Sequence, residues 1–278
     1  MRIGMVGLGR MGANMTKRLI ERGHQVVAHD RNPDAVKAIV EDGAEGCHSL
    51  EELVQALEPP RAVWIMVPSG DPTTMTVNTL STLLEPGDTI IDGGNSNYHH
   101  AVEISTRLTE KDIAFVDAGV SGGVWGLKVG YCLMVGGDEE AVQRLEPILT
   151  ALAPEDGWAH VGPSGAGHYT KMIHNGIEYG MMQAYAEGFE ILEASGFNLD
   201  LAAVADLWNQ GSVIRSWLCE LAADALKKDP HLEAIKGYVE DTGEGRWTLL
   251  ESIEHSVPAP VLALSLIMRF RSRQEESF

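Results

Sequence analysis

Five polar side chains share one face of a predicted helix. Lys171, His174, Asn175, Glu178 and Tyr179 stand at the spacing i, i+3, i+4, i+7 and i+8, which places all five on one helical stripe. On a helix that faces a core this stripe is normally apolar. A solvated stripe rarely combines His, Asn and Tyr, which are weaker helix formers than Glu, Lys and Ala. The pattern therefore favours a functional site over a solvated face.

Lys171 and Glu178 have the chemistry of a base and an acid that lie on either side of a bound substrate. A lysine accepts a proton only when loss of solvation or a neighbouring cation lowers its pKa toward neutrality, and His174 is one candidate neighbour. The stripe thus predicts proton transfer to and from a small molecule.

A glycine motif near the N-terminus predicts a second site. Gly7, Gly9 and Gly12 form the pattern G-x-G-x-x-G between an apolar run and a helical pattern, and Asp30 ends the next apolar run roughly 20 residues later. Such glycines let a pyrophosphate approach a helix N-terminus, and the acid suits ribose hydroxyls. Asp30 would repel a 2′-phosphate and so favours NAD over NADP, whereas the adjacent Arg31 could hold that phosphate.

Three further segments carry small or polar residues suited to ligands. Asn95 and Ser121 follow two apolar runs in glycine-rich turns (residues 92–96 and 121–123), at the sheet edge where ligands of parallel sheets bind. We interpret residues 243–248 as a glycine-flanked loop that offers Arg246 and Thr248 to an anion. Arg269 adds positive charge, while Arg271 and Arg273, taken alone, are interpreted as surface residues or as partners of a helix dipole.

The elements that position these residues fall into two regimes. Apolar runs alternate with helical patterns up to Val161, which predicts a Rossmann-type, doubly wound parallel α/β sheet. Helical patterns follow at 167–195, 199–209, 212–228 and 257–273, the first about 40 Å long. We place the boundary in the glycine-rich segment 162–167, with a dinucleotide-binding domain at 1–164 and an all-α domain for substrate binding and dimerisation at 165–278.

Composition narrows the class of protein. The 278 residues carry 21 Lys and Arg against 40 Asp and Glu, a net charge of −19, which argues against binding to nucleic acid or an anionic membrane. Three widely spaced cysteines indicate neither a disulfide framework nor a metal site. No signal-peptide pattern is present at the start, so we expect a cytoplasmic protein.

At this point the sequence resembles the decarboxylating 6-phosphogluconate dehydrogenases of the pentose phosphate pathway. The matching strings are GLGRMG at 7–12, DGGNS at 92–96, GVSGG at 119–123, GHYTKMIHNGIEYGMMQ at 167–183 and GEGRWT at 243–248. The length is similar to the short bacterial form. The long form usually has Lys where Arg246 stands, and its NADP-using members have Asn-Arg-Thr where this chain has Asp30, Arg31 and Asn32, which is consistent with NAD preference.

The resemblance implies a role for each site residue. Lys171 would remove the 3-hydroxyl proton, Glu178 would protonate C1 of the enediol, and Asn175 is counted with them as catalytic. The substrate carboxylate and hydroxyls would contact Asn95, Ser121, Gly122, Gly123, His174 and Asn175, and the phosphate would contact Tyr179, Arg246, Thr248 and Arg269. The expected cofactor site comprises Gly7, Leu8, Gly9, Arg10, Met11, Gly12, Asp30, Arg31, Asn32, Val67, Pro68, Ser69 and Asn95.

Two other functions stay open at this stage. A dehydrogenase of the 3-hydroxyisobutyrate or tartronate-semialdehyde reductase type would share the fold and the lysine but act on a small acid without decarboxylation. A nucleotide-binding regulatory module would have no use for a base and an acid on one stripe. The apolar residues off the stripe, among them Ile177, Met181 and Met182, also predict burial between subunits, in a homodimer or homotetramer.

Overall fold

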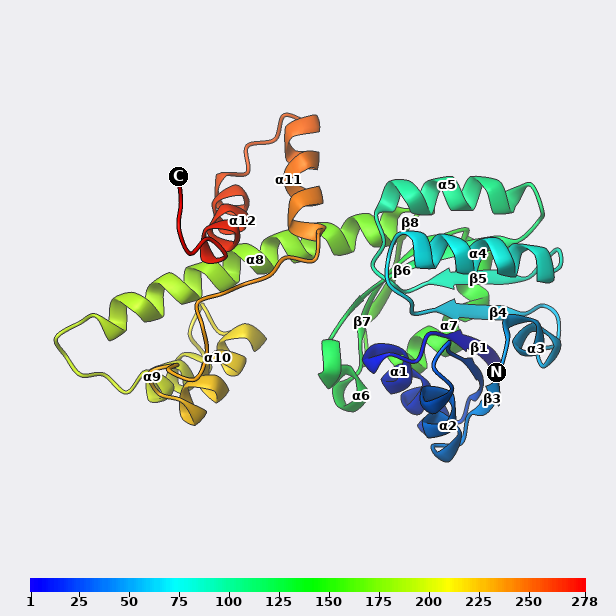
Figure 1. Cartoon of the computed structure of the whole chain (residues 1–278), viewed down its shortest axis with the longest axis horizontal. Helices are drawn as coiled ribbons and strands as arrows, with labels where there is room; N and C mark the ends of the chain where they lie inside the picture. Colours follow the sequence, from blue (N-terminus) through cyan, green and yellow to red (C-terminus); the bar gives the residue numbers. More distant parts are fainter. The chain divides into compact units, whose positions relative to one another are not determined.

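The structure is a computed structural model that describes all 278 residues, and its chain divides into two compact units. The N-terminal unit contains Met1–Met172 and the C-terminal unit Ile173–Phe278, so the division falls inside one long helix. Figure 1 shows the order of the elements along the chain. None of the helices is long and apolar enough to span a bilayer.

The N-terminal unit is built on one sheet of eight strands in the order β3-β2-β1-β4-β5-β6-β7-β8. The strands are β1 (Arg2–Val6), β2 (Gln25–His29), β3 (Glu45–Cys47), β4 (Ala62–Ile65), β5 (Thr89–Asp92), β6 (Ala114–Ser121), β7 (Cys132–Gly137) and β8 (Trp158–Gly162). The predicted Rossmann-type sheet is therefore confirmed. Strands β1 to β6 are parallel, whereas β7 pairs antiparallel with β6 and β8 runs parallel to β7. The sheet is thus mostly parallel, and its last two strands run against the other six.

Helices cover both faces of this sheet (Figure 1). On one face, α1 (Arg10–Glu21), α2 (Pro33–Glu41) and α7 (Glu139–Leu152) bury apolar side chains; on the other, α3 (Leu50–Gln55), α4 (Asp71–Leu83) and α5 (Tyr98–Thr109) do so. A 3₁₀ turn (Gly123–Trp125) and the short α6 (Gly126–Val129) join β6 to β7. Because strands such as β4 are buried at every position, they appear in the sequence as continuous apolar runs.

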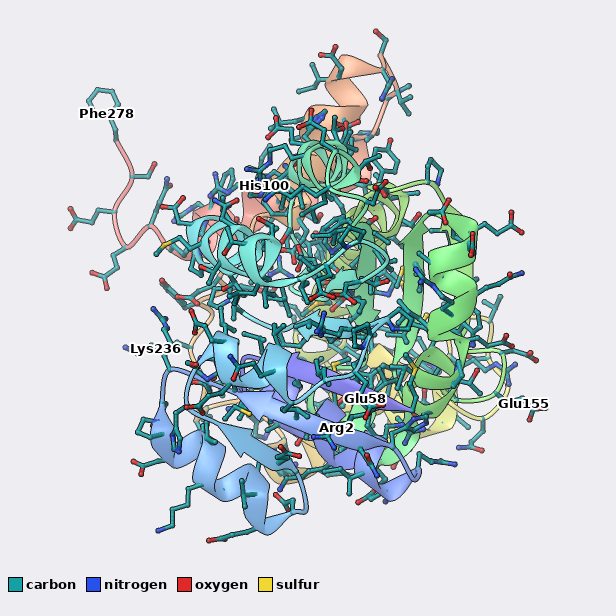
Figure 2. The ribbon with its side chains drawn as sticks, turned by 90° about the vertical axis from the view of Figure 1, so that its right-hand side faces the viewer. Arg2, Glu58, His100, Glu155, Lys236 and Phe278 are labelled. Carbon is teal, nitrogen blue, oxygen red and sulfur yellow. The ribbon has the colours of Figure 1, made fainter.

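Some of the acidic side chains of this unit are exposed. Glu58 precedes β4 and Glu155 lies in the turn before β8, and both are exposed (Figure 2). The acidic excess at these positions lies on the outer surface, where it says little about the charge inside a binding site.

The C-terminal unit is helical throughout. Its helices are the greater part of α8 (Ala166–Glu193), then α9 (Leu201–Trp208), α10 (Trp217–Lys228), α11 (Glu244–Glu254) and α12 (Pro260–Ser272). The predicted helix at 167–195 is thus confirmed. Apolar residues of α9 and α10 pack with Phe189 and Leu192 of α8. Gly176 and Gly180 of α8 let two more helices approach closely: a Cβ at Gly176 would lie 2.5 Å from Thr248 of α11, and one at Gly180 would lie 3.3 Å from Leu262 of α12.

Two helix predictions in this unit need correction. Helix α10 begins at Trp217 and not near 212, because the Ser216 hydroxyl caps it by accepting a hydrogen bond from the Cys219 amide at 3.1 Å. Residues 244–248 are the first turns of α11, so the interpretation of 243–248 as a loop was wrong. Gly243 is the cap residue, with a φ of 107° that favours glycine, and Gly245 is helical although its intrinsic propensity is low.

Candidate functional site

A cavity of about 350 Å³ lies at the carboxyl ends of β1, β2 and β4 in the N-terminal unit. It includes six of the predicted cofactor residues: Gly7, Gly9, Asp30, Arg31, Val67 and Pro68. The sequence-based prediction missed Val6, His29, Leu50, Met66, Pro72, Met75, Thr76 and Thr79, which also line it. Leu8, Arg10, Met11, Gly12, Asn32, Ser69 and Asn95 do not. The side of the cavity formed by α4 could have been anticipated from the polar-apolar pattern that follows β4.

The glycines beside this cavity fit a pyrophosphate. A Cβ at Gly12 would lie only 2.0 Å from the Gly7 carbonyl oxygen, so the turn and the helix pack as closely as glycines allow. Gly9 instead faces open space, with nothing within 4 Å of the position of a Cβ. Gly9 is also the N-cap of α1 and provides no side-chain partner for the first amides of the helix. Free space next to unpaired amides at a helix N-terminus is what a phosphate group requires.

Asp30 shapes the rim of the cavity. Its carboxylate accepts hydrogen bonds from the Leu8 amide at 2.6 Å and from the Asn32 amide at 2.7 Å, one on each oxygen. Each carboxylate oxygen can accept a further hydrogen bond, so Asp30 keeps the capacity to bind ribose hydroxyls. The two amide bonds fix the orientation of the acid before any ligand is present.

Asn95 joins the turn after β5 to the end of strand β6. Its side-chain oxygen accepts from the Val120 amide at 2.9 Å and its side-chain nitrogen donates to the Val120 carbonyl at 3.2 Å. Asn95 adopts a φ of 53°, the left-handed conformation that Asn tolerates better than most residues. The Asn95 amide thus holds segment 92–96 to the carboxyl end of β6, next to residues 121–123.

Buried acids below these turns hold the start of α8. Asp117 of β6 accepts from the Gly165 amide at 2.6 Å and from the His168 amide at 2.8 Å, and so caps the helix from the sheet. His168, which is 1% exposed, places Nε2 3.1 Å from the Asp92 carbonyl oxygen. Because a carbonyl can only accept, Nε2 carries the proton. No feature of the sequence distinguished His168 as a residue that fastens the helix.

Lys171 is therefore placed against β6. It is 5% exposed, and its aliphatic part packs on β6, where a Cβ at Gly119 would lie 2.5 Å from the Lys171 Cβ. A lysine is rarely buried to this extent. The structure therefore places the one lysine of the predicted stripe out of contact with bulk solvent.

The rest of the predicted stripe continues along α8 in the C-terminal unit. His174 Nδ1 lies 3.0 Å from Asn175 Oδ1 and 3.8 Å from the Glu178 carboxylate. The His174 and Glu178 side chains are 38% and 39% exposed, so both have an imidazole or carboxyl face open to solvent. Thr248 of α11 is buried beside Gly176, and its hydroxyl donates to the Glu244 carbonyl at 2.8 Å.

Tyr179 ends the stripe in a cluster of cationic side chains. The Arg269 guanidinium lies 3.5 Å from the centre of the Tyr179 ring, and the Tyr179 hydroxyl accepts from the Thr242 amide at 3.3 Å. Arg246 pairs with Asp241, and the hydrogen bond from Arg246 is the main cause that lowers the pKa of Asp241 to about 2. The structure thus brings Tyr179, Arg246 and Arg269 into one part of the C-terminal unit, as predicted.

Comparisons with known proteins agree with this arrangement. Residues 2–162 match the NAD binding domain of 6-phosphogluconate dehydrogenase, and residues 167–277 match the C-terminal domain of that enzyme. The chain is 47% identical to Bacillus subtilis YqeC, which carries a provisional 6-phosphogluconate dehydrogenase name, over 100% of this chain and 93% of the relative. It is 42% identical, with the same coverage, to the NAD-dependent, decarboxylating 6-phosphogluconate dehydrogenase of Haloferax volcanii.

Solved structures give the same result. The 6-phosphogluconate dehydrogenase of Plasmodium falciparum, studied with its cofactor NADP and with 6-phosphogluconate, superposes with a TM-score of 0.89 at 31% identity, over 98% of this chain and 62% of that one. A 3-hydroxyisobutyrate dehydrogenase of Mycobacterium tuberculosis is 24% identical with a TM-score of 0.79, which reflects a shared fold. With family matches over nearly all of its length, this chain belongs to the 6-phosphogluconate dehydrogenase family.

Proposed function

We propose that the protein converts 6-phosphogluconate to ribulose 5-phosphate and CO2, with NAD as the hydride acceptor and NADP as a poorer substitute. The observation that carries the proposal is the buried Lys171 on the same helix stripe as Glu178 and Tyr179. A buried titratable side chain in line with other polar groups on one helix is typical of a functional site. Family membership supports the same reaction.

The first step is an oxidation at C3 of the substrate. The Lys171 amine, in its neutral form, would accept the proton of the 3-hydroxyl group while the hydrogen on C3 departs with its electron pair as hydride. When bound, NAD supplies the nicotinamide ring that accepts this hydride. The product is a 3-keto acid, and Lys171 is left as an ammonium group beside the new carbonyl oxygen.

The second step breaks the bond between C1 and C2. The carboxylate leaves as CO2, and the electron pair of the broken bond is taken up toward the 3-carbonyl, whose oxygen receives the proton that Lys171 holds. The resulting enediol is protonated by Glu178 at the carbon that becomes C1 of ribulose 5-phosphate. His174 lies 3.8 Å from the Glu178 carboxylate and is suited to deliver a proton to it from solvent.

The remaining roles follow from the positions of polar groups. We assign the substrate carboxylate and hydroxyls to Ser121, Gly122, Gly123, His174 and Asn175, and the phosphate to Tyr179, Arg246, Thr248 and Arg269. Asn95 holds the turn after β5 to β6 through Val120, and the second N–H and lone pair of its amide can bind the substrate. Gly9 and Gly12 accommodate the pyrophosphate of the cofactor, and Asp30 its ribose.

The test is an initial-rate assay of the purified protein that follows NADH formation and CO2 release. 6-Phosphogluconate should give both products, whereas gluconate and 3-hydroxyisobutyrate should be at least about tenfold poorer in kcat/KM, because neither carries a phosphate. The proposal fails if 3-hydroxyisobutyrate is the better substrate, or if NADH forms from 6-phosphogluconate without release of CO2.

A substitution of Lys171 distinguishes a catalytic function from that of a regulatory module. Lys171→Met keeps the aliphatic chain that packs on Gly119 and removes the amine, so turnover should fall by about 10²–10⁴-fold without loss of fold. Lys228→Ala, at an exposed position of α10, is the matched control and should leave turnover unchanged. Equal turnover in both variants would exclude Lys171 as the base.

A further inference from the structure

One carboxylate in the C-terminal unit holds two arginines. Asp241 lies just before α11, and its side chain is 5% exposed. Arg246 of α11 donates to it twice, from Nε to Oδ1 at 2.7 Å and from Nη2 to Oδ2 at 3.1 Å. Arg273, which follows α12, donates from Nη1 to Oδ2 at 2.8 Å. The two guanidinium groups therefore share one acceptor, the Oδ2 atom of Asp241.

An aromatic ring lies beside both arginines. The Arg246 guanidinium is 4.4 Å and the Arg273 guanidinium 5.3 Å from the centre of the Phe270 ring. The Arg273 side chain is only 23% exposed. The interpretation of Arg273 as a surface residue was therefore wrong, whereas the neighbouring Arg271 is exposed and donates to the Gln274 carbonyl.

The cluster keeps both charge and hydrogen-bond donors for a ligand. Two guanidinium groups and one carboxylate leave a net charge of one positive unit, and Arg269 nearby, bonded to the Glu240 carbonyl, adds another. Asp241 accepts hydrogen bonds from Nε and Nη2 of Arg246 and from Nη1 of Arg273. Nη1 of Arg246 and the Nε and Nη2 atoms of Arg273 do not donate to Asp241. A phosphate monoester carries nearly two negative charges and three terminal oxygens, so it can bond to both arginines at once.

We propose that Arg273 is a further phosphate-binding residue, and that Asp241 is a positioning residue which holds Arg246 and Arg273 side by side for one phosphate group. This inference rests on the proposed function, because it takes the phosphate of 6-phosphogluconate as the ligand of Arg246. The inference adds Arg273, which directly follows α12, to the residues that bind the substrate phosphate.

A purely structural role is the competing explanation. The three residues could simply join the segment before α11 to the end of α12. That connection already exists, because the Val239 amide donates to the Ser272 hydroxyl at 3.0 Å. A structural role would lower stability in variants of all three residues and leave phosphate affinity unchanged, whereas a binding role changes phosphate affinity.

The experiment compares the full-length wild-type protein with Arg273→Ala, Asp241→Asn and the control Arg271→Ala. Calorimetric titration with inorganic phosphate measures the site directly, and steady-state kinetics measure KM for 6-phosphogluconate, KM for NAD and kcat. Arg273→Ala should weaken phosphate binding and raise KM for 6-phosphogluconate, each by about tenfold, because a charge-assisted hydrogen bond is lost. KM for NAD should not change.

The other two variants complete the test. Asp241→Asn should raise KM for 6-phosphogluconate more than it lowers kcat, because the two arginines lose the negative charge and one of the two acceptor oxygens, while Lys171 is unchanged. Arg271→Ala should stay within about twofold of wild type in every constant. Arg273→Lys, which keeps the charge but not the fork, should recover part of the phosphate affinity.

Two different results would overturn the role of Arg273 and the proposed function, respectively. If folded Arg273→Ala binds inorganic phosphate as tightly as Arg271→Ala does, the inference about Arg273 is overturned whatever the substrate is. If the wild-type protein does not turn over 6-phosphogluconate, the proposed function fails, and the phosphate titration still decides whether Arg273 binds phosphate.

Discussion

Gly245 of α11 lies so close to Tyr179 of α8 that a Cβ at Gly245 would stand 2.5 Å from the tyrosine ring. Because residue 245 has no side chain, the Tyr179 ring can pack against the backbone of α11. The Arg269 guanidinium lies 3.5 Å from the centre of the same ring. A helix interior normally disfavours glycine. Here close packing of an aromatic ring on the helix backbone outweighs that cost.

Gly245→Ala should therefore affect both stability and substrate binding. The added methyl group would push against Tyr179 and lower the free energy of unfolding by about 1–3 kcal/mol. Displacement of the ring should raise KM for 6-phosphogluconate by about tenfold, with a smaller change in kcat. Chemical denaturation and steady-state kinetics measure the two effects.

The matched control is Gly188→Ala, in the exposed part of α8, where nothing lies within 4 Å of the position of a Cβ. This variant should be more stable than wild type by about 0.4–1 kcal/mol, with unchanged KM. The explanation given for Gly245 is wrong if the two variants behave alike.

Asp30→Asn should shift the coenzyme preference toward NADP. The substitution removes the negative charge that repels a 2′-phosphate and leaves Arg31 beside it, so the ratio of kcat/KM for NADP to that for NAD should rise about tenfold. It also removes one of the two acceptors that bond the Leu8 and Asn32 amides, which should cost about 1 kcal/mol of stability.

Asp34→Asn is the control for this change, because Asp34 is an exposed acid in the first turn of α2. Initial rates with both coenzymes at several concentrations give the ratio for each variant. An unchanged ratio in Asp30→Asn, or an equal shift in Asp34→Asn, would remove Asp30 as the determinant of preference.

The Asp241 carboxylate should contribute stability that depends on pH in the acid range. Its pKa is lowered from 3.8 to about 2 by Arg246, so the carboxylate form is favoured in the folded protein. Such a group stabilises the fold fully above the unfolded pKa, and this contribution disappears as the pH falls through 2. Wild type should exceed Asp241→Asn in unfolding free energy by about 1–2 kcal/mol at pH 6.

Urea denaturation at a series of pH values tests this prediction. The difference between wild type and Asp241→Asn should stay constant from pH 6 to pH 5 and narrow below pH 4. A difference that grows on acidification would have the wrong sign for a carboxylate with a lowered pKa.

The C-terminal unit should associate with a second copy of the chain. Ile177, Met181 and Met182 of α8 are 52%, 39% and 40% exposed, and such apolar exposure within one helix favours burial between subunits. Light scattering at micromolar concentration should give the mass of a dimer or tetramer. Ile177→Glu combined with Met181→Glu should lower that mass, and a monomeric wild-type protein would contradict the prediction.

Patterns of apolar residues predicted much of the fold, because they depend on local periodicity. Strands such as β4 and β5 are buried at every position and stand out as apolar runs. Strand β3 contains only Glu45, Gly46 and Cys47, and it is held by pairing with β2, so no local pattern reveals it. The reversal of β7 was also beyond reach, since alternation of residue types does not encode strand direction.

The candidate site was predictable where residue type and helical spacing were enough. The stripe from Lys171 to Tyr179 needed only the period of a helix. The proposed function of Arg273 depends on Asp241, which is far away in sequence, and on the Phe270 ring beside both arginines. Contacts of this kind come from tertiary packing and leave no periodic signal in the chain.

The two hydrogen bonds between Asn95 and Val120 indicate that this part of the N-terminal unit is ordered before a ligand binds. The turn after β5 cannot separate from the end of β6 unless both bonds break, so this turn is ordered before a ligand arrives. A ligand that binds there has little loop entropy to overcome. In a hydrogen–deuterium exchange experiment the Val120 amide should be protected in the apoprotein, and Asn95→Ala should make it exchange quickly.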